Sequence, residues 1–463
     1  MERRAYARRD VLGAVSAVGA VAVAGCDRLG GSADQRIEVP EESLRDEPVE
    51  IRLRGFEPSS TVTVRASTTF GGGPHWEAEA TFEADDRGEV DLTTQAPTSG
   101  TYDETDGMGL FWSMVRDEGE ATGTGDDGMA SPSPTPSKTT PRTEAIATGT
   151  PADPGLPDAY DVTLRAGTDG ETRTTATTTR RFVAEGVERT SVEEDGVVGE
   201  FFVPPGDGPH PGVVALHGSR GYPMIRHGRM LASHGYATLA LRYFGPHEAI
   251  PDELVDVPLS YFERAITWLR DRESVGTGDV GVLGSSRGGE AALLVGARDD
   301  RVGAVVGYVP SVYLWGGWEA DGDELPAVPR FGSPTVTENG TSFAPMYRQS
   351  VETADDERVA QATIPVEDID APVLLITGED DEMWPAAWFA EVAVQRLSED
   401  GFEHDYDHRS YADAGHGIGI PYVPTAETTS SGTWAFGGTP AGNARAAADS
   451  WPRVLDWLGK GLE

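Results

Sequence analysis

The stretch VGVLGSSRGGEAALLVGA (Val280–Ala297) holds Ser286 between two glycines in the pattern G-x-S-x-G. The apolar run before the serine is typical of a buried strand, and the apolar spacing after it predicts a helix. A serine at a sharp turn from strand to helix is the arrangement of a nucleophile elbow. Gly284 and Gly288 permit this turn without Cβ clashes, and a helix N-terminus favours negative charge beside the serine. We therefore predict that Ser286 is a nucleophile.

The chain around this stretch, from about residue 186 to the end, alternates strand and helix patterns. Continuous apolar runs, typical of buried parallel strands, lie at 211–218, 236–244, 280–284, 302–310 and 372–378. A helical pattern covers 258–272. This alternation predicts an α/β domain over 186–463 with a mostly parallel sheet. Two stretches, 316–350 and 424–445, lack the alternation, and we expect them to be loops that border a pocket.

A serine hydroxyl needs a general base and an orienting carboxylate to act as a nucleophile. Both follow Ser286 in the order that α/β-hydrolases use, with the acid before the histidine. The loop GEDDEMWP after the fifth strand holds Asp380 and Asp381, and AGHG near the end holds His416. We assign His416 as the base and Asp381 as the acid, in preference to Asp380, because of its offset from Gly378.

An oxyanion hole in such an enzyme uses two backbone N–H groups. We expect one from Arg287, which directly follows the nucleophile, and the other from Ser219 or Arg220 in the loop HGSRG after the first apolar strand. His217 starts that loop. We expect it to support the hole, with a direct catalytic role as the alternative.

Metal chemistry is the competing interpretation, because His404 and His408 are four residues apart. The segment is expected to form the last strand before His416, where residues four apart share a face but lie too far apart for one ion. The single cysteine excludes a cysteine-cluster zinc site. We therefore predict no metal and no cofactor.

The N-terminus is typical of an export signal. Arg8 and Arg9 precede a short apolar run, Val11–Gly25, which ends in VAGC. Twin arginines before such a run indicate export of a folded protein. We predict a lipoprotein signal over 1–26, lipid attachment at Cys26, and a location on the outer face of the cell membrane. An unprocessed membrane anchor or a free thiol is the alternative.

We expect a short tether over 27–40 and a β domain over 41–185. Apolar residues alternate with polar ones in runs such as VEIRLRGF and TVTVRAST, and turn-forming residues stand between these runs. This pattern predicts an N-terminal all-β, immunoglobulin-like sandwich. Within it, 118–157 is rich in Pro, Thr, Ser and Gly and nearly lacks large apolar residues, so we predict a disordered insertion there.

The charge balance is strongly acidic, with 77 Asp and Glu against 37 Lys and Arg and a formal net charge of −40. The acidic residues are spread along the chain, which indicates adaptation to high salt, where ions screen the self-repulsion. An acidic surface for a basic partner is the alternative. Nucleic acid is not an expected partner, because phosphate binding needs basic patches.

Several motifs together resemble the acyl-CoA thioesterase / bile acid-CoA:amino acid N-acyltransferase family. They include DEPVEIRLRGFEPSSTVTVRAS and GMGLFWSM (107–114) in the β domain, and LASHGYATLALRYFG, GSSRGGEAALL and AGHGIGIPY in the α/β domain. The resemblance implies an N-terminal β-sandwich, an α/β-hydrolase domain, and cleavage of acyl-CoA thioesters through an acyl-enzyme. Amino-acid transferases of this family use a cysteine nucleophile. Ser286 therefore favours hydrolysis, because an ester on serine is left to water more readily than a thioester on cysteine.

The substrate class has alternatives. Arg287 stands where the family usually has lysine, and CoA is not expected outside the cytoplasm. Arg220, Arg226 and Arg287 are candidates for phosphate contacts, although arginine replaces lysine throughout this chain. The expected partner is an acyl thioester or ester. The alternatives to a thioesterase are a secreted carboxylesterase of the same fold, an acyltransferase to an amine, and a non-catalytic surface lipoprotein.

Overall fold

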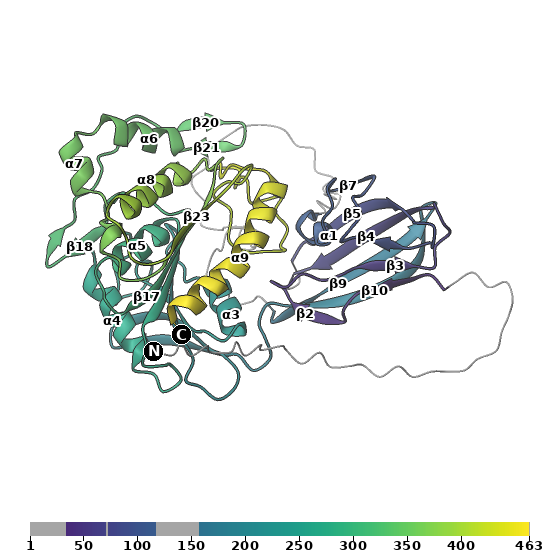
Figure 1. The fold of residues 1–463 in the computed structure, drawn as a ribbon, viewed down its shortest axis with the longest axis horizontal. Helices are drawn as coiled ribbons and strands as arrows, with labels where there is room; N and C mark the ends of the chain where they lie inside the picture. Colours follow the sequence, from purple (N-terminus) through teal and green to yellow (C-terminus); the bar gives the residue numbers. More distant parts are fainter. Residues whose placement is uncertain (1–33, 71–72, 117–156, 463) are drawn as a thin grey trace, which may run out of the picture.

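The computed structural model describes residues 34–70, 73–116 and 157–462, which form a β domain and an α/β domain beside it (Figure 1). The predicted signal over 1–26, Cys26, and the predicted insertion apart from Pro157 lie outside the described residues. Export, lipid attachment and disorder of the insertion therefore stay predictions. Among the described residues, no helix is both long enough and apolar enough to cross a membrane.

The α/β domain is built on an eight-stranded sheet in the order β11-β12-β14-β13-β16-β17-β22-β23. In that order the strands are Glu188–Glu194, Val197–Val203, Ala237–Arg242, Gly212–Leu216, Val280–Ser285, Val302–Tyr308, Val373–Gly378 and Tyr406–Tyr411. Pairing is parallel from β14 to β23, and only β11 and β12 run antiparallel to their neighbours. The predicted mostly parallel sheet is confirmed. Helices cover both faces of its central strands, which are therefore buried and apolar up to Ser285 at the end of β16.

Helices α4 (Leu259–Arg270), α5 (Arg287–Gly296) and α8 (Ala386–Glu399) pack on one face of this sheet. Helices α3 (Ile225–Ser233) and α9 (Pro440–Leu462) pack on the other, the face toward the β domain (Figure 1). Every residue of α5 is buried, because this helix lies against the two central strands β16 and β17. The turn at Ser286 that precedes α5 is thus held between buried elements.

The sequence pattern predicted a loop over 316–350, but the structure has short strands and part of a helix there. The stretch contains β18 (Trp318–Ala320), β19 (Asp323–Glu324), β20 (Thr335–Thr337), β21 (Gly340–Ser342) and the first part of α6 (Ala344–Thr353). Strands of two or three residues are too short to show an alternating pattern, which explains why the sequence did not reveal them. Strand β18 pairs with β15 (Val257–Pro258), and α7 (Asp356–Gln361) and the 3₁₀ helix η1 (Val366–Asp368) lead to β22.

The β domain contains a three-stranded sheet, β1-β3-β6, and a seven-stranded sheet, β2-β10-β9-β4-β5-β7, in which β8 also pairs with β5. The strands β1 to β10 are Arg36–Glu38, Glu42–Leu44, Arg52–Arg54, Thr61–Thr69, His75–Glu83, Val90–Asp91, Ser99–Gly100, Val115–Arg116, Ala159–Thr168 and Glu171–Arg181. Apolar residues of both sheets share one hydrophobic cluster, which also includes the short helix α1 (Gly109–Trp112). The immunoglobulin-like assignment of this domain stays a prediction.

The predicted tether over 27–40 is wrong for its last part, because β1 lies inside it. Strand β1 pairs antiparallel with β3, so that Ile37 lies opposite Leu53. Arg54 donates a hydrogen bond of 2.7 Å to Glu38, and Ile37 packs against the hydrophobic cluster of the domain. The segment that holds β1 has a polar composition typical of a linker, but ion pairing and partial burial give it a defined conformation.

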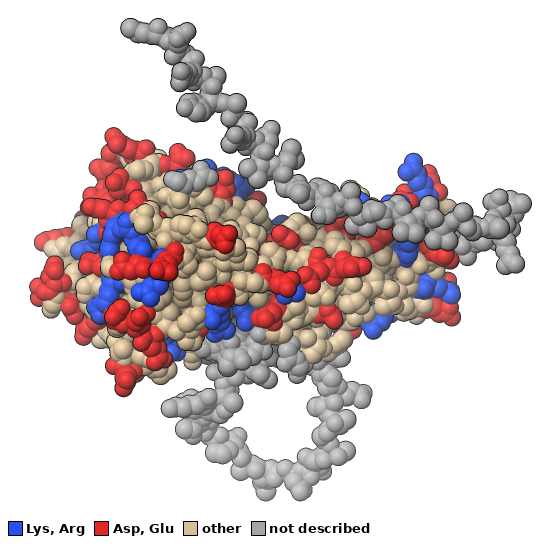
Figure 2. All heavy atoms as spheres, turned by 90° about the horizontal axis from the view of Figure 1, so that it is seen from below, with Lys and Arg blue, Asp and Glu red and all other residues tan. Residues whose placement is uncertain are grey.

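The surface of the described residues is rich in acidic groups. Figure 2 shows Asp and Glu side chains over both domains, with Lys and Arg side chains among them. Many of these cations form ion pairs, such as Arg301 with Asp299 and Arg396 with Glu367. Adaptation to high salt stays a prediction from this charge balance.

The two domains are joined by a buried polar cluster around Asp46 of the β domain. Its Oδ2 accepts hydrogen bonds from His234 Nε2 at 2.8 Å and from Trp451 Nε1 at 2.7 Å. Burial acts against ionisation of both titratable groups, but their mutual hydrogen bond and charge lower the pKa of Asp46 and raise the pKa of His234. The cluster therefore favours the charged pair in the folded protein.

We predict that Asp46→Asn destabilises the protein by about 1.5–3 kcal/mol, the usual range for a hydrogen bond to a charged group. The raised pKa of His234 means that its pairing stabilises the fold fully when the pH is below 6.5, the ordinary pKa of histidine. This stabilisation is lost as the pH rises through the pKa of His234 in the folded protein. The loss from Asp46→Asn should therefore be larger near pH 5.5 than near pH 9. Denaturant unfolding in molar salt measures it.

Asp252→Asn is the matched control, because Asp252 is exposed and its substitution also removes one negative charge. It should change the free energy of unfolding by no more than about 0.5 kcal/mol. Equal losses from Asp46→Asn at both pH values would contradict the charged pair.

Candidate active site

Ser286 lies in a strained turn between β16 and α5. Its backbone has φ 58° and ψ −121°, an unusual conformation for a residue with a side chain. A Cβ on Gly284 would lie 1.9 Å from the carbonyl oxygen of Gly288, and a Cβ on Gly288 would lie 2.1 Å from that of Leu216. Only glycine fits at both positions. The turn closes with a hydrogen bond of 2.9 Å from Ser286 N–H to the Tyr308 carbonyl.

The structure brings the predicted histidine and acid to this serine. His416 Nε2 lies 3.0 Å from Ser286 Oγ, and His416 Nδ1 lies 2.8 Å from Asp381 Oδ2. The other oxygen of Asp381 accepts hydrogen bonds from the backbone N–H groups of Met383 at 2.8 Å and Trp384 at 3.2 Å. Asp380 is exposed. The residue that contacts the histidine is therefore Asp381.

The loop that carries His416 is held by α9 and by the segment before it. His416 N–H donates to the Phe436 carbonyl at 2.7 Å, and Gly415 N–H donates to Asn443 Oδ1 at 2.8 Å. Asn443 in turn donates to Thr428 Oγ1 at 2.9 Å. The sequence analysis missed Asn443, because a lone asparagine inside a helical pattern gives no sign of a contact 28 residues away.

The predicted oxyanion-hole residues border Ser286. Ser219 and Arg220 line the same cavity as the serine, and a Cβ on the neighbouring Gly218 would lie 3.8 Å from Ser286 Oγ. Arg287 is the first residue of α5, where N–H groups have no partner within the helix. Among the described residues, the N–H groups of Ser219 and Arg287 donate to no other group.

His217 uses both ring nitrogens in support of the loop after β13. Nδ1 lies 2.8 Å from the Gly218 carbonyl, and Nε2 lies 3.4 Å from Tyr243 N–H. The ring also stacks on that of Tyr243, with 4.1 Å between centroids. Burial lowers the pKa of His217 to about 3, so the ring is neutral. These contacts match a supporting position rather than a second base.

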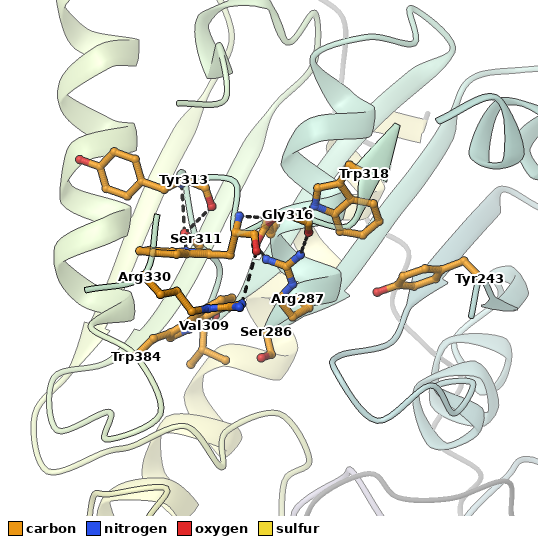
Figure 3. A network of polar contacts seen from close by, with 12 residues as sticks. Tyr243, Ser286, Arg287, Val309, Ser311, Tyr313, Gly316, Trp318, Arg330 and Trp384 are labelled. Carbon is orange, nitrogen blue, oxygen red and sulfur yellow. Dashed lines mark hydrogen bonds and ion pairs between the residues drawn. The ribbon is translucent and has the colours of Figure 1, made fainter. Parts of the chain in front are cut away.

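The Arg287 side chain points away from the serine hydroxyl (Figure 3). Its guanidinium forms a buried ion pair with Glu290, donates to the Gly316 carbonyl, and lies over the Trp318 ring. Of the three arginines that were candidates for phosphate contacts, Arg287 is therefore not placed to make one. Arg220 lies over the Trp434 ring, and Arg226 is buried in the cavity wall.

Glu290 is the second functional candidate that the sequence analysis missed. It is fully buried, and its Oε1 accepts from Trp318 Nε1 at 2.7 Å and from Trp315 N–H at 3.2 Å. Burial raises its pKa to about 7, although Arg287 acts in the opposite direction. The pair ties the nucleophile helix to the segment that precedes β18.

The two histidines considered for a metal lie apart from the serine and have other partners. His404 Nε2 is 2.8 Å from Asp370, and His408 Nε2 is 2.7 Å from Thr377 Oγ1. Among the described residues, no group of three or more His, Cys, Asp or Glu side chains is placed to hold a metal ion.

A cavity of about 170 Å³ opens beside Ser286 and His416. Its wall is mainly apolar, with Met224, Ile225, Ile418, Ile420, Val423 and Phe436. The β domain supports this wall, because Thr425 N–H donates to the Trp112 carbonyl in the motif GMGLFWSM at 2.9 Å. Such a cavity suits an acyl group attached to a carbonyl at the serine.

Here a serine on a strand-to-helix turn contacts a histidine, and that histidine contacts an aspartate, at the carboxyl ends of a mostly parallel sheet. This arrangement defines the α/β-hydrolase class. Residues 46–194 match the family model described as the acyl-CoA thioester hydrolase/BAAT N-terminal region, and 257–463 match BAAT / acyl-CoA thioester hydrolase C terminal. The chain belongs to this family of acyl-CoA thioester hydrolases and bile acid-CoA:amino acid N-acyltransferases.

Its relatives span nearly the same length. Acyl-coenzyme A thioesterase 3 of Mus musculus is 30% identical over 91% of this chain and 92% of its own. The bile acid-CoA:amino acid N-acyltransferase of Mus musculus is 30% identical over 91% of this chain and 96% of its own. The solved acylaminoacyl peptidase of Pyrococcus horikoshii covers 90% of this chain and 74% of its own, with 11% identity and a TM-score of 0.41.

We predict that Glu290→Gln destabilises the protein by about 3–5 kcal/mol, because it leaves the buried Arg287 guanidinium without its counter-charge. The double variant Arg287→Met/Glu290→Gln should lose less than the single variant, since no unpaired charge stays buried. Denaturant unfolding in molar salt measures both.

Glu263→Gln on the exposed face of α4 is the control and should change stability by less than about 0.5 kcal/mol. A double variant less stable than Glu290→Gln would show that the ion pair is not the reason for the loss.

Proposed function

We propose that the protein is a serine thioesterase that hydrolyses acyl thioesters of the acyl-CoA type. The observation that carries this proposal is the hydrogen-bonded series Ser286–His416–Asp381 beside an apolar cavity, in a chain of the acyl-CoA thioester hydrolase family. In this proposal Ser286 is the nucleophile, His416 the general base and Asp381 the acid that orients the base.

The geometry supports an acyl-enzyme mechanism. With its Nδ1–H donated to Asp381, neutral His416 presents Nε2 as an acceptor to Ser286 Oγ. Ser286 Oγ attacks the thioester carbonyl carbon while its proton passes to Nε2. The tetrahedral intermediate then expels the thiol, which takes this proton. Water then attacks the carbonyl carbon of the acyl-serine ester while its proton passes to His416 Nε2. The second tetrahedral intermediate releases the carboxylic acid, and Ser286 Oγ takes the proton back from His416.

The negative oxygen of the tetrahedral intermediate needs donors that are already in place. In this proposal the N–H groups of Arg287 and Ser219 supply them, with Arg220 as the neighbouring candidate. The N-terminus of α5 adds the positive end of its helix dipole at the same point. Each such donor contributes about 2.7–4 kcal/mol to the transition state in comparable enzymes.

We predict that Ser286→Ala lowers acyl-CoA hydrolysis by about three orders of magnitude or more, and Asp381→Asn by about four, through loss of the histidine's orientation. Asp380→Asn is the matched control, because the exposed neighbour does not contact His416. It should keep near wild-type kcat/KM. Thiol release from a series of acyl-CoA substrates, in molar salt, measures all three.

The same variants should be assayed on p-nitrophenyl esters. Ester hydrolysis without thioester hydrolysis would identify a carboxylesterase. Equal losses from Asp380→Asn and Asp381→Asn would contradict the assignment of the acid. Full activity of Ser286→Ala would contradict the whole proposal.

We predict that Ser286→Cys shifts the products from the free acid toward the amide when an amine such as glycine is present. A thioester on cysteine reacts with amines more readily than an ester on serine, so the ratio of aminolysis to hydrolysis should rise. Mass spectrometry of the products measures this ratio. Wild-type protein that already yields mainly amide would contradict the hydrolase proposal and favour an acyltransferase.

A further inference from the structure

One face of helix α9 borders the cavity beside Ser286. Asn443 and Ala447, four residues apart on this helix, both line the cavity. Residues at this spacing lie about one helical turn apart on the same face. Asn443 marks the end near His416, because its Oδ1 accepts a hydrogen bond from the neighbouring Gly415 N–H. The cavity therefore extends along α9 from the His416 loop past Ala447.

The other end of the cavity is closed where α9 meets α3. Trp451, one turn beyond Ala447 on the same face of α9, is buried and is not part of the described cavity wall. Its ring lies 6.4 Å, between centroids, from that of His227, which does line the cavity. The backbone of Gly419 packs against the same ring, since a Cβ on Gly419 would lie 3.5 Å from His227 Nε2. These three residues leave no passage beyond Ala447.

The wall between the two ends suits a plain hydrocarbon. Its apolar side chains are Met224, Ile225, Ile418, Ile420, Val423 and Phe436. The hydroxyls of Thr425 and Thr428 donate to backbone carbonyls, and Asn443 donates to Thr428. An alkyl chain in the cavity therefore leaves none of these three polar side chains without a partner.

The size of the cavity limits the chain that fits. The volume is about 170 Å³, close to that of a cavity of about 150 Å³ that holds the six carbons of benzene. A saturated chain of about six to eight carbons fills such a space. A longer chain that reached the closed end would place its carbonyl beyond Ser286.

We propose that the substrate carries an unsubstituted, saturated acyl chain of about six to eight carbons, and that Ala447 sets this length. The inference rests on the proposed function, because it takes the cavity to hold the acyl group. Ala447 presents only a methyl group beside the closed end. A larger side chain there would occupy the space of the last carbons of the chain, so Ala447 is a specificity-determining residue.

The test is a binding measurement that needs no turnover. Saturated fatty acids, from butanoic to dodecanoic acid, are titrated into the full chain in molar salt and followed by calorimetry. We expect affinity to rise about fourfold with each carbon, the equivalent of about 0.8 kcal/mol per buried CH₂, up to about eight carbons and then to stay level. The kcat/KM for the CoA thioesters of these acids should have its maximum at the same length.

Two variants should move this limit in opposite directions. Ala447→Leu adds an isopropyl group to the wall, so the affinity should stop rising about three carbons earlier. His227→Ala removes the ring at the closed end, so the affinity should continue to rise for about two carbons more. Ala448→Leu is the matched control, because Ala448 is the next residue of α9, half-buried and outside the described cavity wall. It should leave the length profile unchanged.

A wild-type affinity that still rises between decanoic and dodecanoic acid overturns the inference, and so does a length profile that folded Ala447→Leu leaves unchanged. If Ala447→Leu lowers kcat/KM equally at every length, the cavity holds the thiol side and the inference fails. Tighter binding of a dicarboxylic acid than of the fatty acid of equal length also overturns it, because the buried Arg226 of the wall would then supply a counter-charge.

The binding profile and turnover separate this inference from the proposed function. If the profile and its shifts are found but no thioester is hydrolysed, the proposed function fails and the length limit stands. If Ala447→Leu does not fold, the smaller change Ala447→Val and the variant His227→Ala decide.

Discussion

The active site depends on two backbone segments that lie closer than any side chain with a Cβ would allow. Gly288 at the start of α5 packs against the Leu216 carbonyl at the end of β13, and Gly284 packs against Gly288. This contact forces Ser286 into its strained conformation and aims α5 at the sheet edge. Because α5 is buried along its whole length, the surrounding core maintains the strain. Packing of these backbone segments thus positions Ser286, together with the hydrogen bond from its N–H to the Tyr308 carbonyl.

Helix α9 connects this site to the β domain. Its Asn443 holds the loop of His416, its Ala444 packs in the hydrophobic cluster of the β domain, and its Trp451 donates to Asp46. The segment before α9 makes a further contact, from Thr425 to Trp112. The β domain therefore forms part of the support of His416 and of the cavity wall, which gives a physical reason for the two domains to occur together in one chain.

Buried polar groups surround the site in pairs, and each pair joins elements far apart in sequence. Glu290 and Arg287 connect α5 to the segment before β18, and His217 connects the loop after β13 to Tyr243. In a low-dielectric interior these contacts are strong when complete and costly when broken.

The sequence alone determined the alternation of the main strands and helices of the α/β domain, the glycine spacing at Ser286, and the succession of serine, acid and histidine, because these depend on local pattern and chain order. It favoured Asp381 over Asp380 without a contact to decide between them, offered Arg287 as a candidate for a phosphate contact, and gave no sign of Asn443 or Glu290. Those features depend on which side chain faces which neighbour once the sheet is assembled. Only the tertiary structure decided them, because burial and hydrogen bonding between residues far apart in sequence follow from packing, which no local pattern encodes.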